Sequence, residues 1–195
     1  MKYWFYCSFL FLHTISMAQD SPFPYAQIPS YPDTYSSGNI LSRMVDGLGY
    51  RYYWATEGLK QQDLDYKPSG EARSTFETIQ HLYGLSEMIL NAAINEPNVR
   101  PADWSDLSFR DLRRKTLEQL RQASQLYSKL SEEELAKAQV IFKNGENENA
   151  FPLWHIMNGP IADALWHAGQ VVSFRRSSGN PMNPNVNVFM GQTRY

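Results

Sequence analysis

Apolar residues recur every three or four positions in several segments, which is the pattern of helices with one buried face. Ser36 and Ser108 are residue types that cap helix N-termini, and each precedes such a stripe. Ser74 and Glu77 have the spacing of a capping box before a further stripe. We expect three buried helix faces: Leu41, Val45, Leu48, Tyr52, Ala55 and Leu59; Ile79, Leu82, Leu85, Ile89 and Ala92; and Phe109, Leu112, Thr116, Leu120, Ala123, Tyr127 and Leu130.

A fourth helix is predicted over residues 161–177, and Gly179 suits its C-terminal cap. Its beginning stays open, because Pro160 fits the first turn of a helix but also kinks a longer one. Three segments lack helical periodicity, and we expect a loop, an extended segment and a coil tail at residues 97–108, 138–142 and 180–195 respectively. The prediction is therefore an all-α protein built as a four-helix bundle.

The first eighteen residues have the organisation of a secretory signal peptide. Lys2 gives a positive start, residues 3–15 form an apolar run, and a small-x-small site ends at Ala18. The alternative is a membrane anchor, but the run is shorter than the roughly 20 apolar residues that a spanning helix needs. We expect cleavage after Ala18, a periplasmic or secreted protein without membrane insertion, and one mature domain at residues 19–195. Its residues 19–37 are expected to form an extended arm over the domain surface.

Composition excludes several kinds of chemistry. The single cysteine, Cys7, lies within the predicted signal peptide, so cysteine nucleophiles, thiolate zinc sites and redox pairs are excluded from the mature chain. The formal net charge is −2, and the basic runs are as short as Arg113-Arg114-Lys115. Nucleic acid is therefore not expected as a partner.

Three residues have the spacing of a metal site in a helical bundle. Asp163 and His167 are four residues apart, which places them one turn apart on one helix face, and His81 comes from another predicted helix. Two imidazoles and a carboxylate can bind Zn, Ni, Fe or Mn, and three protein ligands leave a position for water or substrate. The alternative is a hydrogen-bonded Asp–His pair in a helix groove that holds no ion.

Two other residues compete for places at this site. His155 lies twelve residues before His167, which is about 18 Å along an unbroken helix and too far to share an ion. If the helix begins only at Pro160, His155 could fold back toward the site. We expect a mainly structural role, with helix capping or support of a ligand as the alternatives. Glu77 lies one turn before His81 and could orient its ring, but service in the capping box is the stronger interpretation. No general base or other catalytic residue can be named from the sequence.

The order and spacing of these residues resemble the DinB superfamily of DinB/YfiT-like metalloenzymes. The resemblance covers nearly all of the mature chain and is carried by DYKPS at residues 65–69, STFETIQHL around His81 and DALWHAGQVVSFRRSSGNP at residues 163–181. In the family, the last helix usually carries His-x-x-x-His followed by Arg-Gly-Gln. His167 matches the second His and His81 matches the family's helix-two His, but Asp163 replaces the first His and Ala168 replaces the Arg.

The resemblance implies an up-down-down-up four-helix bundle, often dimeric, with a divalent metal at one end. Characterised relatives include metal-dependent thiol transferases and a thiol-dependent isomerase. The first functional hypothesis is a metal-dependent hydrolase or transferase acting on a small molecule, with His81, Asp163 and His167 as ligands. The second, motivated by Asp163, is a non-catalytic envelope protein that binds a small molecule and has lost the metal. A third, structural hypothesis makes the aromatic arm and the tail a homodimer interface.

Overall fold

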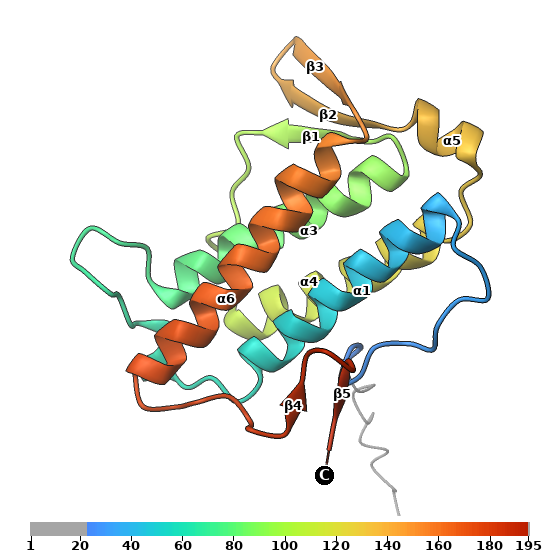
Figure 1. Ribbon diagram of the computed structural model, residues 1–195. Helices are drawn as coiled ribbons and strands as arrows, with labels where there is room; N and C mark the ends of the chain where they lie inside the picture. The colour runs from blue at the N-terminus through green and yellow to red at the C-terminus, as the bar shows by residue number, and fades with distance from the viewer. Residues whose placement is uncertain (1–22, 195) are drawn as a thin grey trace, which may run out of the picture.

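Four long helices form the centre of the protein (Figure 1). The computed structural model describes residues 23–194, and its long helices are α1 (Ser37–Thr56), α3 (Thr75–Ala93), α4 (Phe109–Tyr127) and α6 (Ala162–Ser177). Both α1 and α3 pack against α4 and against α6. The helices therefore form a square in which α1 and α3 lie at opposite corners.

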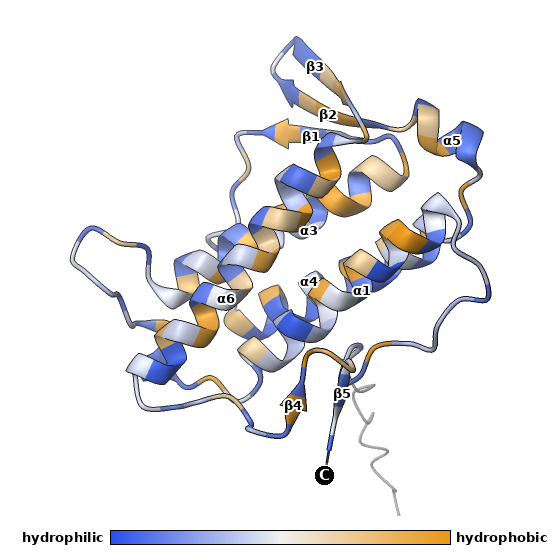
Figure 2. Ribbon diagram, viewed as in Figure 1, coloured by the Kyte–Doolittle hydropathy of each residue, from blue (hydrophilic) through white to orange (hydrophobic). Residues whose placement is uncertain are grey.

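The helix boundaries follow the predicted caps. The Ser36 hydroxyl accepts a hydrogen bond from the backbone N–H of Asn39, and Ser108 caps α4 in the same way. Ser74 and Glu77 form the predicted capping box at the start of α3. Apolar and polar residues are interspersed along the long helices, as the orange and blue segments in Figure 2 show. The predicted apolar faces are buried, apart from three residues that are partly buried against the core: Leu59, Phe109 and Leu130.

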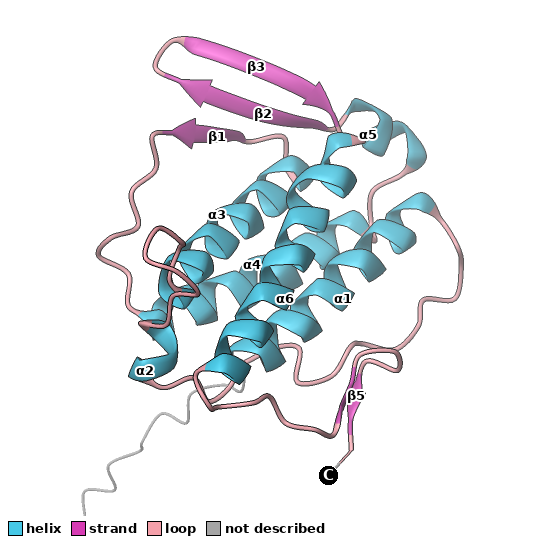
Figure 3. Cartoon of the chain, turned by 60° about the vertical axis from the view of Figure 1, so that its left-hand side comes forward, coloured by secondary structure: helices cyan, strands magenta, loops and turns pink. Residues whose placement is uncertain are grey.

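The prediction of an all-α four-helix bundle is wrong, because the chain also forms two small sheets (Figure 3). Strand β1 (Pro97–Arg100) pairs in parallel with β2 (Gln139–Asn144), which pairs antiparallel with β3 (Asn147–Pro152). This mixed sheet lies across one end of the helices (Figure 1). The second sheet is antiparallel and joins β4 (Val186–Asn187) to β5 (Gln192–Thr193). The protein is therefore a mixed structure with a helical core.

Two of the three predicted connecting segments contain strands that the sequence did not indicate. Residues 97–108 were expected to be a loop, but β1 is fixed by the buried side chain of Asn98, whose amide donates to the Ile141 carbonyl at 2.8 Å. Residues 180–195 were expected to be a coil tail, but they contain β4 and β5. The extended prediction for residues 138–142 is confirmed by β2.

The described residues before α1 contact that helix and the C-terminal tail. The Trp54 indole donates to the Ala26 carbonyl at 3.1 Å, and the Ile28 N–H donates to the Gly191 carbonyl at 2.8 Å. The arm thus touches both α1 and the C-terminal tail. The predicted signal peptide, with its cleavage site at Ala18, lies outside the described residues. Within residues 23–194, no helix combines the length and apolarity needed to cross a membrane.

The chain is irregular just before α6, which is why the sequence did not fix the residue at which this helix begins. A π-helical turn, η1 (Met157–Ile161), directly precedes α6 and contains Pro160. Its Gly159 has φ −93° and ψ −108°, which is not helical. Two short helices, α2 (Gln61–Leu64) and α5 (Glu132–Lys137), complete the described helical structure.

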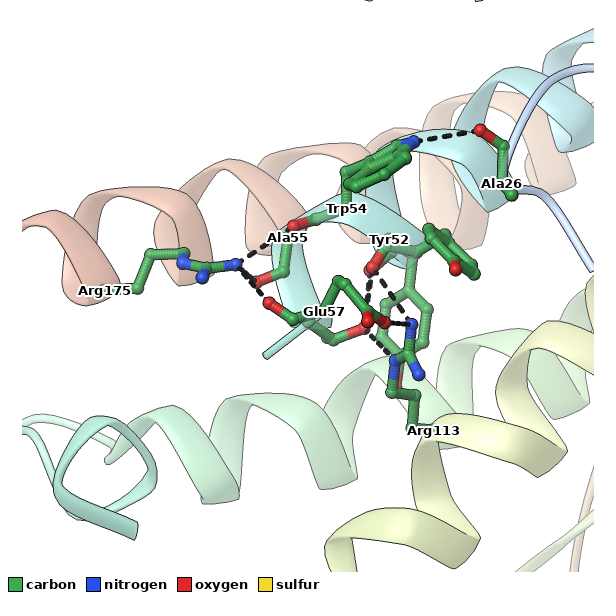
Figure 4. Close-up of polar contacts among 9 residues, drawn as sticks. Ala26, Tyr52, Trp54, Ala55, Glu57, Arg113 and Arg175 are labelled. Atoms are coloured by element: carbon green, nitrogen blue, oxygen red, sulfur yellow. Dashed lines mark hydrogen bonds and ion pairs between the residues drawn. The ribbon is translucent and has the colours of Figure 1, made fainter. Parts of the chain in front are cut away.

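The C-terminal end of α1 is held by an arginine from another helix (Figure 4). One terminal nitrogen of the buried Arg175 donates to the carbonyls of Trp54, Ala55 and Glu57 at 3.0, 3.1 and 2.9 Å. These carbonyls belong to the last turn and end of α1, where the helix itself supplies no partner. Arg175 therefore links the ends of α1 and α6. This contact is separate from any favourable interaction between its charge and the dipole of α6.

Candidate metal centre

The packing of α3 against α6 brings together the three residues that the sequence singled out. His81 lies in the second turn of α3, whose register is set by the Ser74 capping box. Asp163 lies in the first turn of α6, and His167 follows one turn later. Ligands that are 82 positions apart in the chain therefore meet in space.

Both imidazole rings approach the same carboxylate. His81 Nε2 lies 3.1 Å from Asp163 Oδ2, and His167 Nε2 lies 3.3 Å from Asp163 Oδ1. The two rings are nearly perpendicular, with centroids 4.6 Å apart. One ligand atom from each of the three residues lies within 4.8 Å of the others, so the group could hold a metal ion.

Each nitrogen–oxygen separation is close to that of two ligands of one metal ion. Two ligand atoms that are each about 2.0–2.1 Å from a zinc ion at the tetrahedral angle are about 3.3 Å apart. The distances of 3.1 and 3.3 Å end on different oxygens of Asp163, and each is also the length of a hydrogen bond.

The site is partly open to solvent. The side chains of His81 and Asp163 are 30% and 42% exposed, whereas that of His167 is 15% exposed. A ligand or water molecule can therefore approach from the side of His81 and Asp163, while His167 is the deepest member.

Electrostatics favour the neutral form of His81. Burial lowers the pKa of its imidazole, and the nearby His167 and Arg73 lower it further, against the opposing effect of Asp163. The neutral imidazole is the form that binds metals. The environment of His81 thus suits a ligand.

One further residue contacts the group, and the sequence analysis gave it no role. Gln170 Oε1 lies 2.6 Å from His167 Nδ1, on the opposite edge of the ring from Asp163. The i, i+3 spacing of His167 and Gln170 was the available indication, but such polar pairs are common on helices.

The structure does not bring His155 or Glu77 into the group. His155 is exposed and its ring makes an edge contact with Phe151, with centroids 5.7 Å apart. Glu77 accepts from the Ser74 N–H and pairs with Lys67 at 3.3 Å, as its capping role predicts.

Two surface pockets lie beside the helical core. One has a volume of about 490 Å³ between α2 and the first turns of α3 and α4, and Glu77 lines it one turn from His81. The other has a volume of about 460 Å³ and a largely apolar lining that includes Leu135, Trp154 and Met157. Neither pocket is lined by His81, Asp163 or His167.

No protein-family model, curated protein or solved structure matches this chain. Fold and site define a helical protein with a small mixed sheet and a group of two histidines and one aspartate that could hold a metal ion.

Proposed function

We propose that this protein is a divalent-metal-dependent enzyme, a hydrolase or transferase that acts on a small molecule. The observation that supports the proposal is the convergence of His81 Nε2 and His167 Nε2 on the two oxygens of Asp163. These groups come from two helices and form a partly exposed cluster, which suits three protein ligands and one open position.

His81, Asp163 and His167 would hold the ion. When bound, the ion would supply Lewis-acid chemistry or lower the pKa of a water molecule at the open position. Two nitrogens and one oxygen without thiolate suit Zn, Ni, Fe or Mn. The partial exposure of Asp163 leaves room for a substrate beside the ligands.

We further propose membership of the DinB superfamily. The matching positions of His81 and His167 support it, while Asp163 supplies a carboxylate where the family usually has an imidazole. A carboxylate oxygen is a normal ligand for zinc at about 2.0–2.2 Å, so the replacement keeps a ligand at this position.

The direct test is metal analysis of protein purified without a histidine tag. We expect about one ion per chain in the wild type and a loss of binding of at least tenfold in His167→Ala. His155→Ala is the matched control, because it removes an exposed imidazole away from the group and should keep the metal. No stoichiometric metal in the wild type, even after anaerobic addition of Zn, Ni, Mn or Fe, would reject the proposal.

A second candidate is a non-catalytic protein that binds a small molecule. It is favoured by the carboxylate of Asp163, whose oxygens lie 3.1 and 3.3 Å from the two rings, which are hydrogen-bond distances. A protein of this kind melts at the same temperature with and without chelator. A chelator-dependent drop in the wild type, absent from Asp163→Ala, counts against this candidate because a ligand bound to the native state stabilises it.

Location and assembly are also proposals. N-terminal sequencing of protein recovered from the periplasm or medium should begin at Gln19 if the signal peptide is cleaved as proposed. Light scattering tests the proposed homodimer, and a monomer at all concentrations would contradict it.

A further inference from the structure

We propose that Gln170 is a positioning residue that makes the His167–Asp163 pair a receptor for a cation. It does so by directing the Nε2 lone pair of His167 at the carboxylate. The inference rests on the proposed metal site. It gives the reason why His167 would bind an ion and not simply donate a hydrogen bond to Asp163.

The contact with Gln170 fixes which ring nitrogen of His167 carries the hydrogen. A neutral imidazole has one N–H and one lone pair, and an amide oxygen can only accept. The 2.6 Å contact between His167 Nδ1 and Gln170 Oε1 therefore needs the hydrogen on Nδ1. It follows that Nε2 of the neutral ring carries the lone pair.

In the neutral ring that lone pair faces the Asp163 carboxylate. His167 Nε2 lies 3.3 Å from Asp163 Oδ1, so two acceptors would point at each other and repel. A bound cation would offset this repulsion. A metal ion fits this requirement and also uses the lone pair that imidazole offers to metals.

The other side of the carboxylate is different. His81 Nε2 lies 3.1 Å from Asp163 Oδ2, and the contacts of its ring include no Gln170 counterpart among the described hydrogen bonds. His81 can therefore carry its hydrogen on Nε2 and donate it to Asp163, or carry it on Nδ1 and leave Nε2 as a ligand atom. The group is asymmetric, because the tautomer of His167 is fixed before any ion binds and that of His81 is not.

The burial of the residues supports this order. The His167 side chain is 15% exposed, half the value for His81, so His167 has less access to water that could replace the Gln170 contact. Partners that fix the tautomer of a metal-binding histidine typically change metal affinity by 10–100-fold when removed. Gln170 is suitably placed for this effect.

The experiment measures tautomer and affinity separately. Nitrogen-15 NMR of histidine-labelled, metal-free protein at pH 8 reports the His167 tautomer, and competition with a chromogenic chelator gives the zinc dissociation constant. We expect the Nδ1–H tautomer in the wild type. Gln170→Leu should move the hydrogen to Nε2, where it can bond Asp163, and weaken zinc binding about 10–100-fold.

Two further variants make the test specific. Gln170→Glu keeps an acceptor at this position and should retain the Nδ1–H tautomer and zinc binding. Gln122→Leu makes the same replacement on the exposed surface of α4 and should change neither measurement. Circular dichroism verifies that each variant is folded, and Gln170→Met is the substitute if the leucine variant is not.

The outcomes separate this inference from the proposed function. Zinc binding by the wild type, with unchanged tautomer and affinity in Gln170→Leu, overturns the role of Gln170 and leaves the metal site intact. Absence of zinc binding by the wild type overturns the proposed function and the cation role together. In that case a tautomer shift in Gln170→Leu still supports orientation of the ring by Gln170, and no shift overturns it.

Discussion

At the scale of single residues, Asp63 shows how contacts decide the charge of a buried group. Its carboxylate is fully buried and accepts from the Ser178 hydroxyl at 2.5 Å, the Asn180 amide at 2.6 Å and the Lys60 N–H at 2.8 Å. Burial alone would raise the pKa of Asp63, but these donors and the charge of Arg175 lower it below its ordinary value. Asp63 thereby ties α2 to the end of α6.

This carboxylate predicts a pH-dependent stability. Because its folded pKa lies below the unfolded value of about 3.9, Asp63 contributes stability that is present above about pH 4 and lost as the pH falls through the folded pKa. Asp63→Asn should lower the free energy of unfolding by about 1–3 kcal/mol at pH 7 and by less at pH 3.

Urea unfolding at the two pH values measures the difference. Asp65→Asn is the matched control, because Asp65 is exposed and its hydrogen bond to Gln61 lies on the surface. It should change the free energy of unfolding by about 0.5 kcal/mol or less. An equal loss for Asp63→Asn at both pH values would contradict the charged role.

The sequence singled out the three members of the candidate metal group, but it did not show that Gln170 contacts one of them. Histidines are few in this chain, and the spacing of Asp163 and His167 indicated a shared helix face. The role of Gln170 depends on which atom of the ring it meets. Gln170 falls on the Gln of the Arg-Gly-Gln that follows the second His in the family the sequence resembles, but that match does not show which atom of the ring the side chain meets.

At the scale of secondary-structure elements, Arg175 connects two helices through backbone carbonyls. Replacing it with methionine keeps much of the apolar stem but leaves the carbonyls at the end of α1 without their donor. We expect Arg175→Met to lower the free energy of unfolding by about 2–4 kcal/mol.

The neighbouring arginine provides the control. Arg176 is exposed, so Arg176→Met should change the free energy of unfolding by about 0.5 kcal/mol or less. Thermal and urea denaturation of both variants measure this difference. Similar losses in the two variants would show that Arg175 acts only as a charge near the end of α6.

Alanine substitutions at two glycines of α1 test whether the N-terminal arm packs closely against this helix. A Cβ at Gly49 would lie 2.5 Å from ring carbons of Tyr25, whereas a Cβ at Gly47 would meet only the end of the Arg51 side chain at 3.4 Å. Gly49→Ala should therefore destabilise the protein by about 1–3 kcal/mol through displacement of the arm. Gly47→Ala should stabilise it by up to about 1 kcal/mol through helix propensity.

Urea unfolding of both alanine variants distinguishes packing from propensity. The account expects shifts of opposite sign within one helix. If Gly49→Ala stabilises the protein as much as Gly47→Ala does, Tyr25 does not need the space above Gly49.

Helices were predictable from the sequence, and strands mostly were not. The stripe from Leu41 to Ala55 is long enough to repeat its period several times, and Ser36 marks its beginning. Strand β1 has four residues, starts with Pro97 and depends on a partner more than 40 positions away. A strand this short shows no clear alternation, so its pairing appears only in the folded chain.

At the scale of the whole molecule, the four long helices support two separate features, the packed arm and tail on one side and the candidate metal group on another. The arm and the tail pack on α1, where Tyr50 and Thr193 share a hydrogen bond at 2.9 Å. The candidate metal group lies instead between α3 and α6. The sequence indicated both helices but could not show that their packing would bring His81 to Asp163, because that contact depends on the arrangement of all four long helices.

The most direct test is an anomalous-diffraction crystal structure of the protein grown with zinc. The account predicts one strong zinc peak about 2.0–2.2 Å from a nitrogen of His81, an oxygen of Asp163 and Nε2 of His167. A structure with zinc bound elsewhere, or with no zinc peak beside His81, Asp163 and His167, would contradict it.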